Sequence, residues 1–208
     1  MQLIGQYDSP FVRRVAIALT RYGIAFENLP YSVMGDWAKF VRQNPLRRVP
    51  ALVLDDGEAL IESGAILDYL DERAGPAKAL VAASGPERRA ALKRVALATG
   101  VADKAVSFFY MRIFASDVDA GFAERSRAQI VEGLTALEAE CATRSGDWWH
   151  GETPGHDDIA VACVARFVSE AWSDLVSLGG YPALAAHCAA AEARPEFMAT
   201  AKPFDPPR

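Results

Sequence analysis

Three short stretches in the first third of the chain carry residues that could bind or activate a small molecule. In the first stretch, Tyr7 and Ser9 stand just before Pro10. A serine before a proline is typical of a helix start, where unpaired main-chain N–H groups and the helix dipole favour an anion or a thiolate. Ser9 could donate a hydrogen bond to a thiolate, with Tyr7 as the alternative donor, or it could simply cap the helix.

The second stretch is Val49-Pro50, which directly precedes the apolar run Ala51–Leu54. Proline cannot donate a hydrogen bond to a strand ladder, so it tends to occupy a strand start or a cis turn. A cis bond would turn the main-chain N–H and C=O of Val49 outward, where they could pair with an extended peptide. About 95% of such bonds are trans, so an ordinary proline at the strand start is the alternative.

The third stretch is Glu62-Ser63, between a short apolar run and a helical pattern. Ser63 and the N–H groups around it could hold a carboxylate, while Glu62 could attract an ammonium group. The alternative is a capping serine beside a solvated glutamate. An amino-acid head group, a peptide backbone and a thiolate are the three ligand parts that these stretches suit, and glutathione contains all three.

Composition excludes several other classes of protein. The chain has 208 residues, 51% of them hydrophobic, and a net charge of -5, which indicates a globular protein and argues against nucleic-acid binding. The cysteines and histidines lack the spacing of a disulfide framework or a metal site. The longest apolar run, Ile159–Ala165, is too short to span a membrane, and Met1–Gly5 lacks the basic start of a signal peptide. We expect a cytoplasmic protein without a metal.

The elements that must position these stretches follow from the apolar patterns. Residues 1–76 read as β-α-β-α-β-β-α, in which the first two strands are parallel and the last two form an antiparallel hairpin. The expected elements, in chain order, are strand Gln2–Gln6, helix Pro10–Tyr22 ending at Gly23, extended Ala25–Pro30, helix Asp36–Arg42, strands Ala51–Leu54 and Ala59–Ile61, and a helix capped by Ser63 that closes near Gly75. This order predicts a mixed sheet with helices.

The rest of the chain predicts a second domain made only of helices. From Ser84 onward the sequence is rich in alanine and follows a 3.6-residue apolar period. Residues 159–168 are apolar on nearly every side, as in a helix surrounded by other helices. The expected domains are therefore residues 1–76, a linker at 77–83, and a helical domain at 84–208.

Five stretches in matching order resemble the glutathione transferase family, in its bacterial-like form with a serine-type active site. They are Ser9–Arg13, Asn44–Leu52, Glu62–Leu70, Gly151 with Asp158–Ala160, and Tyr181-Pro182 with Arg194–Phe197. The resemblance implies a thioredoxin-like N-terminal domain followed by an all-helical C-terminal domain. It also implies glutathione as co-substrate, a small hydrophobic electrophile, a homodimer, and a role in detoxification.

The resemblance also implies a role for each candidate residue. Ser9 would donate a hydrogen bond to the glutathione sulfur, and Val49-Pro50 would present main chain to the cysteinyl part. Glu62-Ser63 would bind the γ-glutamyl end, with Arg48 near the tripeptide. The electrophile pocket would lie between the domains, lined by Phe11 and by two aromatic residues of the long helix, Phe109 and Tyr110.

The chain departs from the family pattern at several positions. Arg47 stands where many relatives have glycine, and Gly155 replaces the serine or threonine that caps a later helix. No cysteine lies near Ser9, which argues against the thiol-transferase branches, and the double-serine-cysteine signature of maleylacetoacetate isomerases is missing. Two other functions stay open: a non-catalytic glutathione-binding or assembly module, and a glutathione-dependent peroxidase or isomerase.

Overall fold

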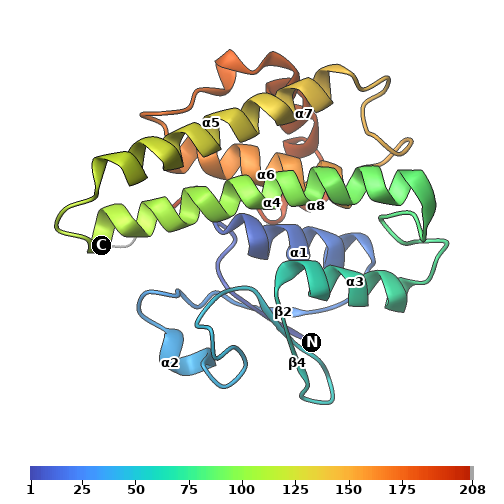
Figure 1. Ribbon diagram of the computed structural model, residues 1–208. Coiled ribbons are helices and arrows are strands. Elements are labelled where there is room, and N and C mark those ends of the chain that lie inside the picture. Colours follow the sequence, from blue (N-terminus) through green and yellow to red (C-terminus); the bar gives the residue numbers. More distant parts are fainter. Residues whose placement is uncertain (207–208) are drawn as a thin grey trace. The chain divides into compact units, whose positions relative to one another are not determined.

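A computed structural model of the protein describes residues 1–206 and shows a small sheet with helices, followed by a run of helices (Figure 1). This confirms the predicted thioredoxin-like domain followed by a helical domain. The elements in chain order are β1 (Gln2–Ile4), α1 (Pro10–Arg21), β2 (Glu27–Leu29), α2 (Trp37–Phe40), β3 (Ala51–Val53), β4 (Ala59–Ile61), α3 (Ser63–Ala74), α4 (Gly85–Phe114), α5 (Ala120–Ala142), α6 (His156–Ala171), the 3-10 turn η1 (Leu178–Gly180), α7 (Pro182–Glu192) and α8 (Pro195–Met198).

The sheet has the strand order β2-β1-β3-β4. β1 runs parallel to β2, and β3 runs antiparallel to β4, as the sequence predicts. The structure adds that β1 runs antiparallel to β3. In this register Ile4 lies opposite Ala51, which lies opposite Ile61. The last residues of β1 and β4 and the first residue of β3 therefore meet at the same end of the sheet.

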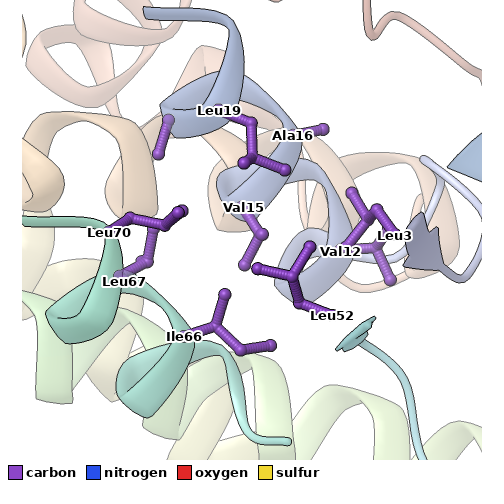
Figure 2. Packing of buried hydrophobic residues seen from close by; sticks show 10 residues of the cluster. Leu3, Val12, Val15, Ala16, Leu19, Leu52, Ile66, Leu67 and Leu70 are labelled. Atoms are coloured by element: carbon purple, nitrogen blue, oxygen red, sulfur yellow. The ribbon is translucent and has the colours of Figure 1, made fainter. Parts of the chain in front are cut away.

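Helices α1 and α3 pack against each other and against the sheet. α1 begins at Pro10 because Ser9 caps it, and it ends where Gly23 takes a φ of +66°. Figure 2 shows apolar side chains of α1 and α3 pointing toward one another, with Leu3 and Leu52 added from the sheet. Each large side chain buried in this way contributes about 1.5–3 kcal/mol. This core holds the start of α1 in place.

The helical part of the chain is built around α6. Its residues 156–165 are all buried, and α6 contacts α7, which in turn contacts α5. Trp172, just after α6, donates its indole N–H to the carbonyl oxygen of Ala105 at 3.2 Å and stacks on Phe108 at 4.6 Å between ring centroids. The predicted enclosure of this helix by other helices is confirmed.

Contacts divide the chain into two compact units. One unit joins residues 1–88 with the segment from Arg194 onward, and the other comprises residues 89–193. The domain limits expected from the sequence, at residues 76 and 84, stay a prediction. Within residues 1–206, no helix has both the length and the apolar character needed to cross a membrane.

Candidate functional site

The three stretches singled out in the sequence converge at one end of the sheet. The loop with Tyr7 and Ser9 follows the end of β1, Val49-Pro50 precedes the first residue of β3, and Glu62-Ser63 follows the last residue of β4. Because Ile4, Ala51 and Ile61 are opposite one another in the register, these three loops begin side by side. The sheet thus brings residues more than 50 positions apart to one place.

Gly5 makes this close approach possible, a role that the sequence analysis missed. A Cβ at Gly5 would lie 2.5 Å from Cγ2 of Val12 and 2.9 Å from Cβ of Val49. Both distances are shorter than van der Waals contact, and the φ of +130° is one that side chains with a Cβ rarely adopt. The first turn of α1 and the loop before β3 therefore meet across a glycine. A glycine inside the predicted strand Gln2–Gln6 was the available signal, because such a glycine often marks a close approach of other main chain.

Ser9 is half-buried at the start of α1, where its Oγ accepts a long hydrogen bond of 3.5 Å from the main-chain N–H of Val12. The capping role weighed in the sequence analysis is thus present. It does not use the hydroxyl proton, because Ser9 is the acceptor in that bond. Ser9 can cap the helix and still donate a hydrogen bond to an anion.

Tyr7 is also half-buried, and its ring packs against the core beneath α1. Burial raises the pKa of the Tyr7 phenol above its ordinary value of 10.0. At neutral pH the phenol therefore stays protonated, so that Tyr7 is available as a hydrogen-bond donor and not as a base.

Val49-Pro50 is a cis peptide bond, the less common of the two alternatives considered from the sequence. Among residues 1–206, no hydrogen bond to the main-chain N–H or C=O of Val49 is found. The preceding loop is held by Asn44, which is 1% exposed. Its amide donates to the carbonyl oxygen of Arg48 at 2.8 Å, and its Oδ1 accepts from the N–H of Leu46 at 3.0 Å. Asn44 therefore positions the main chain that leads to Val49.

Glu62 and Ser63 form the junction between β4 and α3. Glu62 has a φ of 65° and a ψ of 121°, a conformation that costs a residue other than glycine roughly 1–3 kcal/mol. The prediction that Ser63 caps α3 is wrong: the helix begins at Ser63 itself, and no side chain caps its first turn. Ser63 is buried at 5% exposure with no hydrogen bond to its hydroxyl found among the described residues. The junction is strained, and its buried serine hydroxyl caps no helix.

Arg48 lies beside this junction, and Arg47 directly precedes Arg48 in the chain. Nη1 of Arg48 is 3.8 Å from Oε1 of Glu62, and both side chains are half-exposed. Arg47, a position where the sequence analysis noted a departure from the family pattern, has a φ of 54°, a value that glycine adopts more readily. Its guanidinium carbon lies 3.8 Å from the ring centroid of Trp37. The departure at Arg47 is thus accommodated by stacking on an aromatic ring.

The places of Phe11, Phe109 and Tyr110 in the structure do not test the predicted electrophile pocket. Phe11 is half-buried in the first turn of α1. Phe109 and Tyr110 are half-buried in α4 with ring centroids 6.0 Å apart, and Phe109 also meets Trp172 edge-on at 6.4 Å. Their role toward a substrate stays a prediction.

Comparison with known proteins identifies the family. The model of the glutathione S-transferase N-terminal domain matches residues 3–78, and that of the C-terminal domain matches residues 120–190. A Caenorhabditis elegans protein named probable maleylacetoacetate isomerase is 30% identical over 152 residues, which are 72% of this chain and 67% of that protein. The chain belongs to the glutathione S-transferase family.

Other members of the family match different shares of the chain. The Escherichia coli GST-like protein YibF is 40% identical over 106 residues, and the chain spans only half the length of that relative. The crystal structure of a glutathione S-transferase from Methylobacillus flagellatus KT, with glutathione bound, has a TM-score of 0.87 and 28% identity. That similarity covers 96% of this chain and 98% of the solved one.

Proposed function

We propose that this glutathione S-transferase family member binds glutathione at the end of the sheet and activates its sulfur for attack on a small electrophile. The observation that carries the proposal is the convergence of Ser9, Val49 and Ser63, each with a polar group that the described protein leaves unused. The glutathione bound in the Methylobacillus relative supports the same ligand.

Each part of glutathione has a chemically suited partner in this arrangement. The γ-glutamyl ammonium is attracted by the Glu62 carboxylate, and the neighbouring carboxylate accepts hydrogen bonds from Ser63 and the uncapped first turn of α3. The main chain of Val49 pairs with the cysteinyl part as an added strand does. Arg48, beside Glu62, provides a positive charge for a carboxylate of the tripeptide. Together these contacts direct the sulfur toward Ser9.

The chemical task is to ionise that sulfur at neutral pH. A thiol with an ordinary pKa of about 8.5 is only a few per cent thiolate at pH 7, and lowering this pKa by about 2 units takes about 2.7 kcal/mol. One hydrogen bond from the Ser9 hydroxyl to the thiolate contributes about 1.5–3 kcal/mol. The amino end of α1 adds about 0.3–1 kcal/mol. These two contributions are sufficient, and Tyr7 is the alternative donor.

In the transferase reaction the thiolate attacks an electrophilic carbon, so that a carbon–sulfur bond forms and the leaving group departs with its electron pair. The second candidate is an isomerase, in which the same thiolate adds to a double bond and later leaves. The name of the Caenorhabditis elegans relative favours this second reaction. The missing double-serine-cysteine signature argues for the transferase.

The test is a calorimetric titration with glutathione, followed by assays of conjugation on a panel of small electrophiles and of cis–trans isomerisation of a maleyl acid. Conjugation supports the transferase and isomerisation alone supports the second candidate. Binding without turnover points to a carrier, and absence of binding overturns the proposal in favour of an assembly role.

Replacing Ser9 with alanine separates binding from activation. Ser9→Ala should lower turnover about 10- to 100-fold, because a hydrogen bond to the thiolate is lost, while the Kd for glutathione changes little. Ser145→Ala, at an exposed serine of the helical unit, serves as the matched control. Unchanged turnover in Ser9→Ala would transfer the role to Tyr7.

We further propose that the protein acts in the cytoplasm as a homodimer, with detoxification as its role. The family resemblance supports the dimer, and the absence of paired cysteine motifs from the sequence supports a reducing compartment. Sedimentation should give twice the 22.5 kDa mass of the chain. A protein that sediments with the mass of one chain and still turns over glutathione would contradict the proposed homodimer.

A further inference from the structure

The hydrogen-bond ladder between β1 and β2 ends one step before the candidate site. Along this pair of strands, the N–H of Glu27 donates to the carbonyl oxygen of Met1 at 3.0 Å, and the N–H of Gly5 donates to that of Leu29 at 2.9 Å. The even spacing of a parallel ladder would continue with the N–H of Tyr31 donating to Gly5. The N–H of Tyr31 donates instead to the carbonyl oxygen of Leu29, at 2.7 Å. The ladder therefore provides no donor for the carbonyl oxygen of Gly5.

The side chain of Asn28, in β2, provides that donor. Its Nδ2 lies 3.0 Å from the carbonyl oxygen of Gly5 and 3.1 Å from that of Leu3. Both partners are carbonyl oxygens, which only accept, so the two N–H bonds of the amide are both used. The half-buried Asn28 thus fixes the main chain on both sides of Ile4, at the end of β1.

Gly5 connects this contact to the site. Glycine adopts positive and negative φ about equally readily, so its own conformational preference does not hold Gly5 in place. Gly5 nevertheless lies against Val12 in the first turn of α1 and against Val49 before the cis proline. The next residue, Gln6, accepts the N–H of Ser9 at its carbonyl oxygen at 3.2 Å. A shift of Gly5 would therefore move the loop that carries Ser9.

We infer that Asn28 is a positioning residue for the reaction, which acts through Gly5 to set the place of Ser9 beside the glutathione sulfur. Asparagine is depleted in β-strands, and this hydrogen-bonding role accounts for its presence in β2. The inference rests on the proposed function for its effect on the sulfur. The contacts that carry it lie within one unit of the chain.

The loss of Asn28 should affect activation of the sulfur more than binding of glutathione. The main chain that leads to Val49 is held separately by Asn44, whose amide donates to the carbonyl oxygen of Arg48 at 2.8 Å. The Ser9 hydroxyl must meet the thiolate with good hydrogen-bond geometry, and such bonds weaken steeply as that geometry is lost. A small shift of Ser9 therefore raises the pKa of the bound thiol while other contacts to glutathione remain.

Hydrogen exchange tests the positioning without any ligand. The amide of Ser9 should exchange about two- to tenfold faster in Asn28→Ala than in the parent chain, the range expected for one lost hydrogen bond. Gln2→Ala is the matched control, because Nε2 of Gln2 also joins β1 to β2, at 2.8 Å from Oε2 of Glu27, but at the opposite end of β1. Exchange at Ser9 that is equal in the two variants overturns the inference.

Titration of the bound thiol tests the consequence for catalysis. Asn28→Asp keeps the size of the side chain but turns oxygens without N–H toward the two carbonyls. In Asn28→Ala and Asn28→Asp, the thiolate fraction of bound glutathione at pH 7, measured by ultraviolet absorbance, should fall about three- to tenfold. The kcat for an aryl chloride should fall by a similar factor, and the Kd for glutathione should change less than about twofold.

These readouts separate positioning from a purely structural role. Gln2→Ala should match the parent chain in thiol pKa and in kcat. Asn28 variants that are less stable in urea but keep the parent thiol pKa and kcat would show that Asn28 only stabilises the sheet, which overturns the inference.

The two proposals fail in distinguishable ways. A parent chain that does not bind glutathione overturns the proposed function, whereas the exchange of the Ser9 amide still decides whether Asn28 positions the loop. A parent chain that binds and conjugates glutathione, with Asn28 variants that equal Gln2→Ala in every readout, overturns the role of Asn28 alone.

Discussion

Helix α3 follows β4 after the single residue Glu62, and helix α6 follows a longer loop. The first turns of these two helices are arranged in opposite ways. At α6, Asp158 Oδ2 accepts from the N–H of Gly155 at 2.9 Å, and Oδ1 accepts from the N–H of Trp149 at 3.4 Å. At α3, Glu62 makes no such bond and takes a positive φ instead. At the start of α6 a side chain accepts hydrogen bonds from main-chain N–H groups, whereas at the start of α3 no side chain does so.

The surroundings show the same contrast. Next to Asp158, the fully buried Asp157 is paired through Oδ2 with Nε of Arg94 at 2.8 Å and Nε2 of His150 at 3.0 Å. Beside α3, Arg48 and Glu62 are half-exposed and 3.8 Å apart. Polar groups at the start of α6 thus stabilise the fold, whereas the proposed function assigns those at the start of α3 to a ligand, at a cost in strain.

The largest effect on stability should come from a side chain at Gly5, where the first turn of α1 and the loop before β3 lie close together. Gly5→Ala should destabilise the protein by about 3 kcal/mol, because the new Cβ meets Val12 and Val49 and the φ of +130° is strained. Urea unfolding measures this change. Gly57→Ala is the matched control, since Gly57 has a φ of +94° but open space around it. Equal costs in the two variants would show that strain alone, and not the close approach, explains the need for Gly5.

The second largest effect on stability should come from removing the side chain of Asp158 at the start of α6. Asp158→Ala leaves the N–H groups of Gly155 and Trp149 without their acceptor, and it should lower the free energy of unfolding by about 2 kcal/mol. Glutathione affinity, measured by calorimetry, should stay the same. A loss of affinity without a loss of stability would contradict the structural role given to this helix start.

Ser63→Ala should show the reverse of Asp158→Ala, with weaker glutathione binding and nearly unchanged stability. Its hydroxyl makes no cap bond, so the free energy of unfolding should change by less than about 0.5 kcal/mol. The Kd for glutathione should rise about tenfold or more, because a hydrogen bond to a carboxylate is lost. Denaturation and titration of the same preparation measure both quantities. Unchanged affinity would remove Ser63 from the proposed site.

A further effect concerns the dependence of stability on pH. Burial, with the nearby charge of Asp157, raises the pKa of Asp158 to about 7, and burial lowers the pKa of His187 to about 4. Between pH 4 and 7 the folded state holds the extra proton on Asp158, so this residue makes stability fall as pH rises. His187 acts oppositely, because its neutral form is favoured on folding and stability is lost as pH falls from 6.5 to 4.

The variant Asp158→Asn removes the first of these two contributions. Relative to the parent, its stability should increase with pH between 4 and 7 by up to about 1.4 kcal/mol per pH unit. Urea unfolding across that range measures the difference. Asp147→Asn, at an exposed aspartate near the same helix, should give a flat difference curve. A flat curve for Asp158→Asn as well would contradict the raised pKa.

Much of the site could be located from the sequence because each of its parts is a local signal. Ser9-Pro10 starts a helix, Val49-Pro50 precedes a strand, and Glu62-Ser63 lies between a strand and a helix. Gly5 and Asn44 were missed, since their importance depends on Val12, Val49 and Arg48. No local pattern reports which side chains approach a glycine or which carbonyl an amide will hold.

The sequence by itself determined the order of strands and helices, because apolar periodicity and turn residues act within a few positions of one another. It also determined which residues have the chemistry to hold a zwitterion and a thiolate. Only the tertiary structure decided that Ser63 does not cap its helix, that Glu62 adopts a positive φ, and that the main-chain N–H of Asp205 donates to Asp8. Those outcomes depend on strand register and on contacts between distant segments, and such contacts form only when the whole core packs.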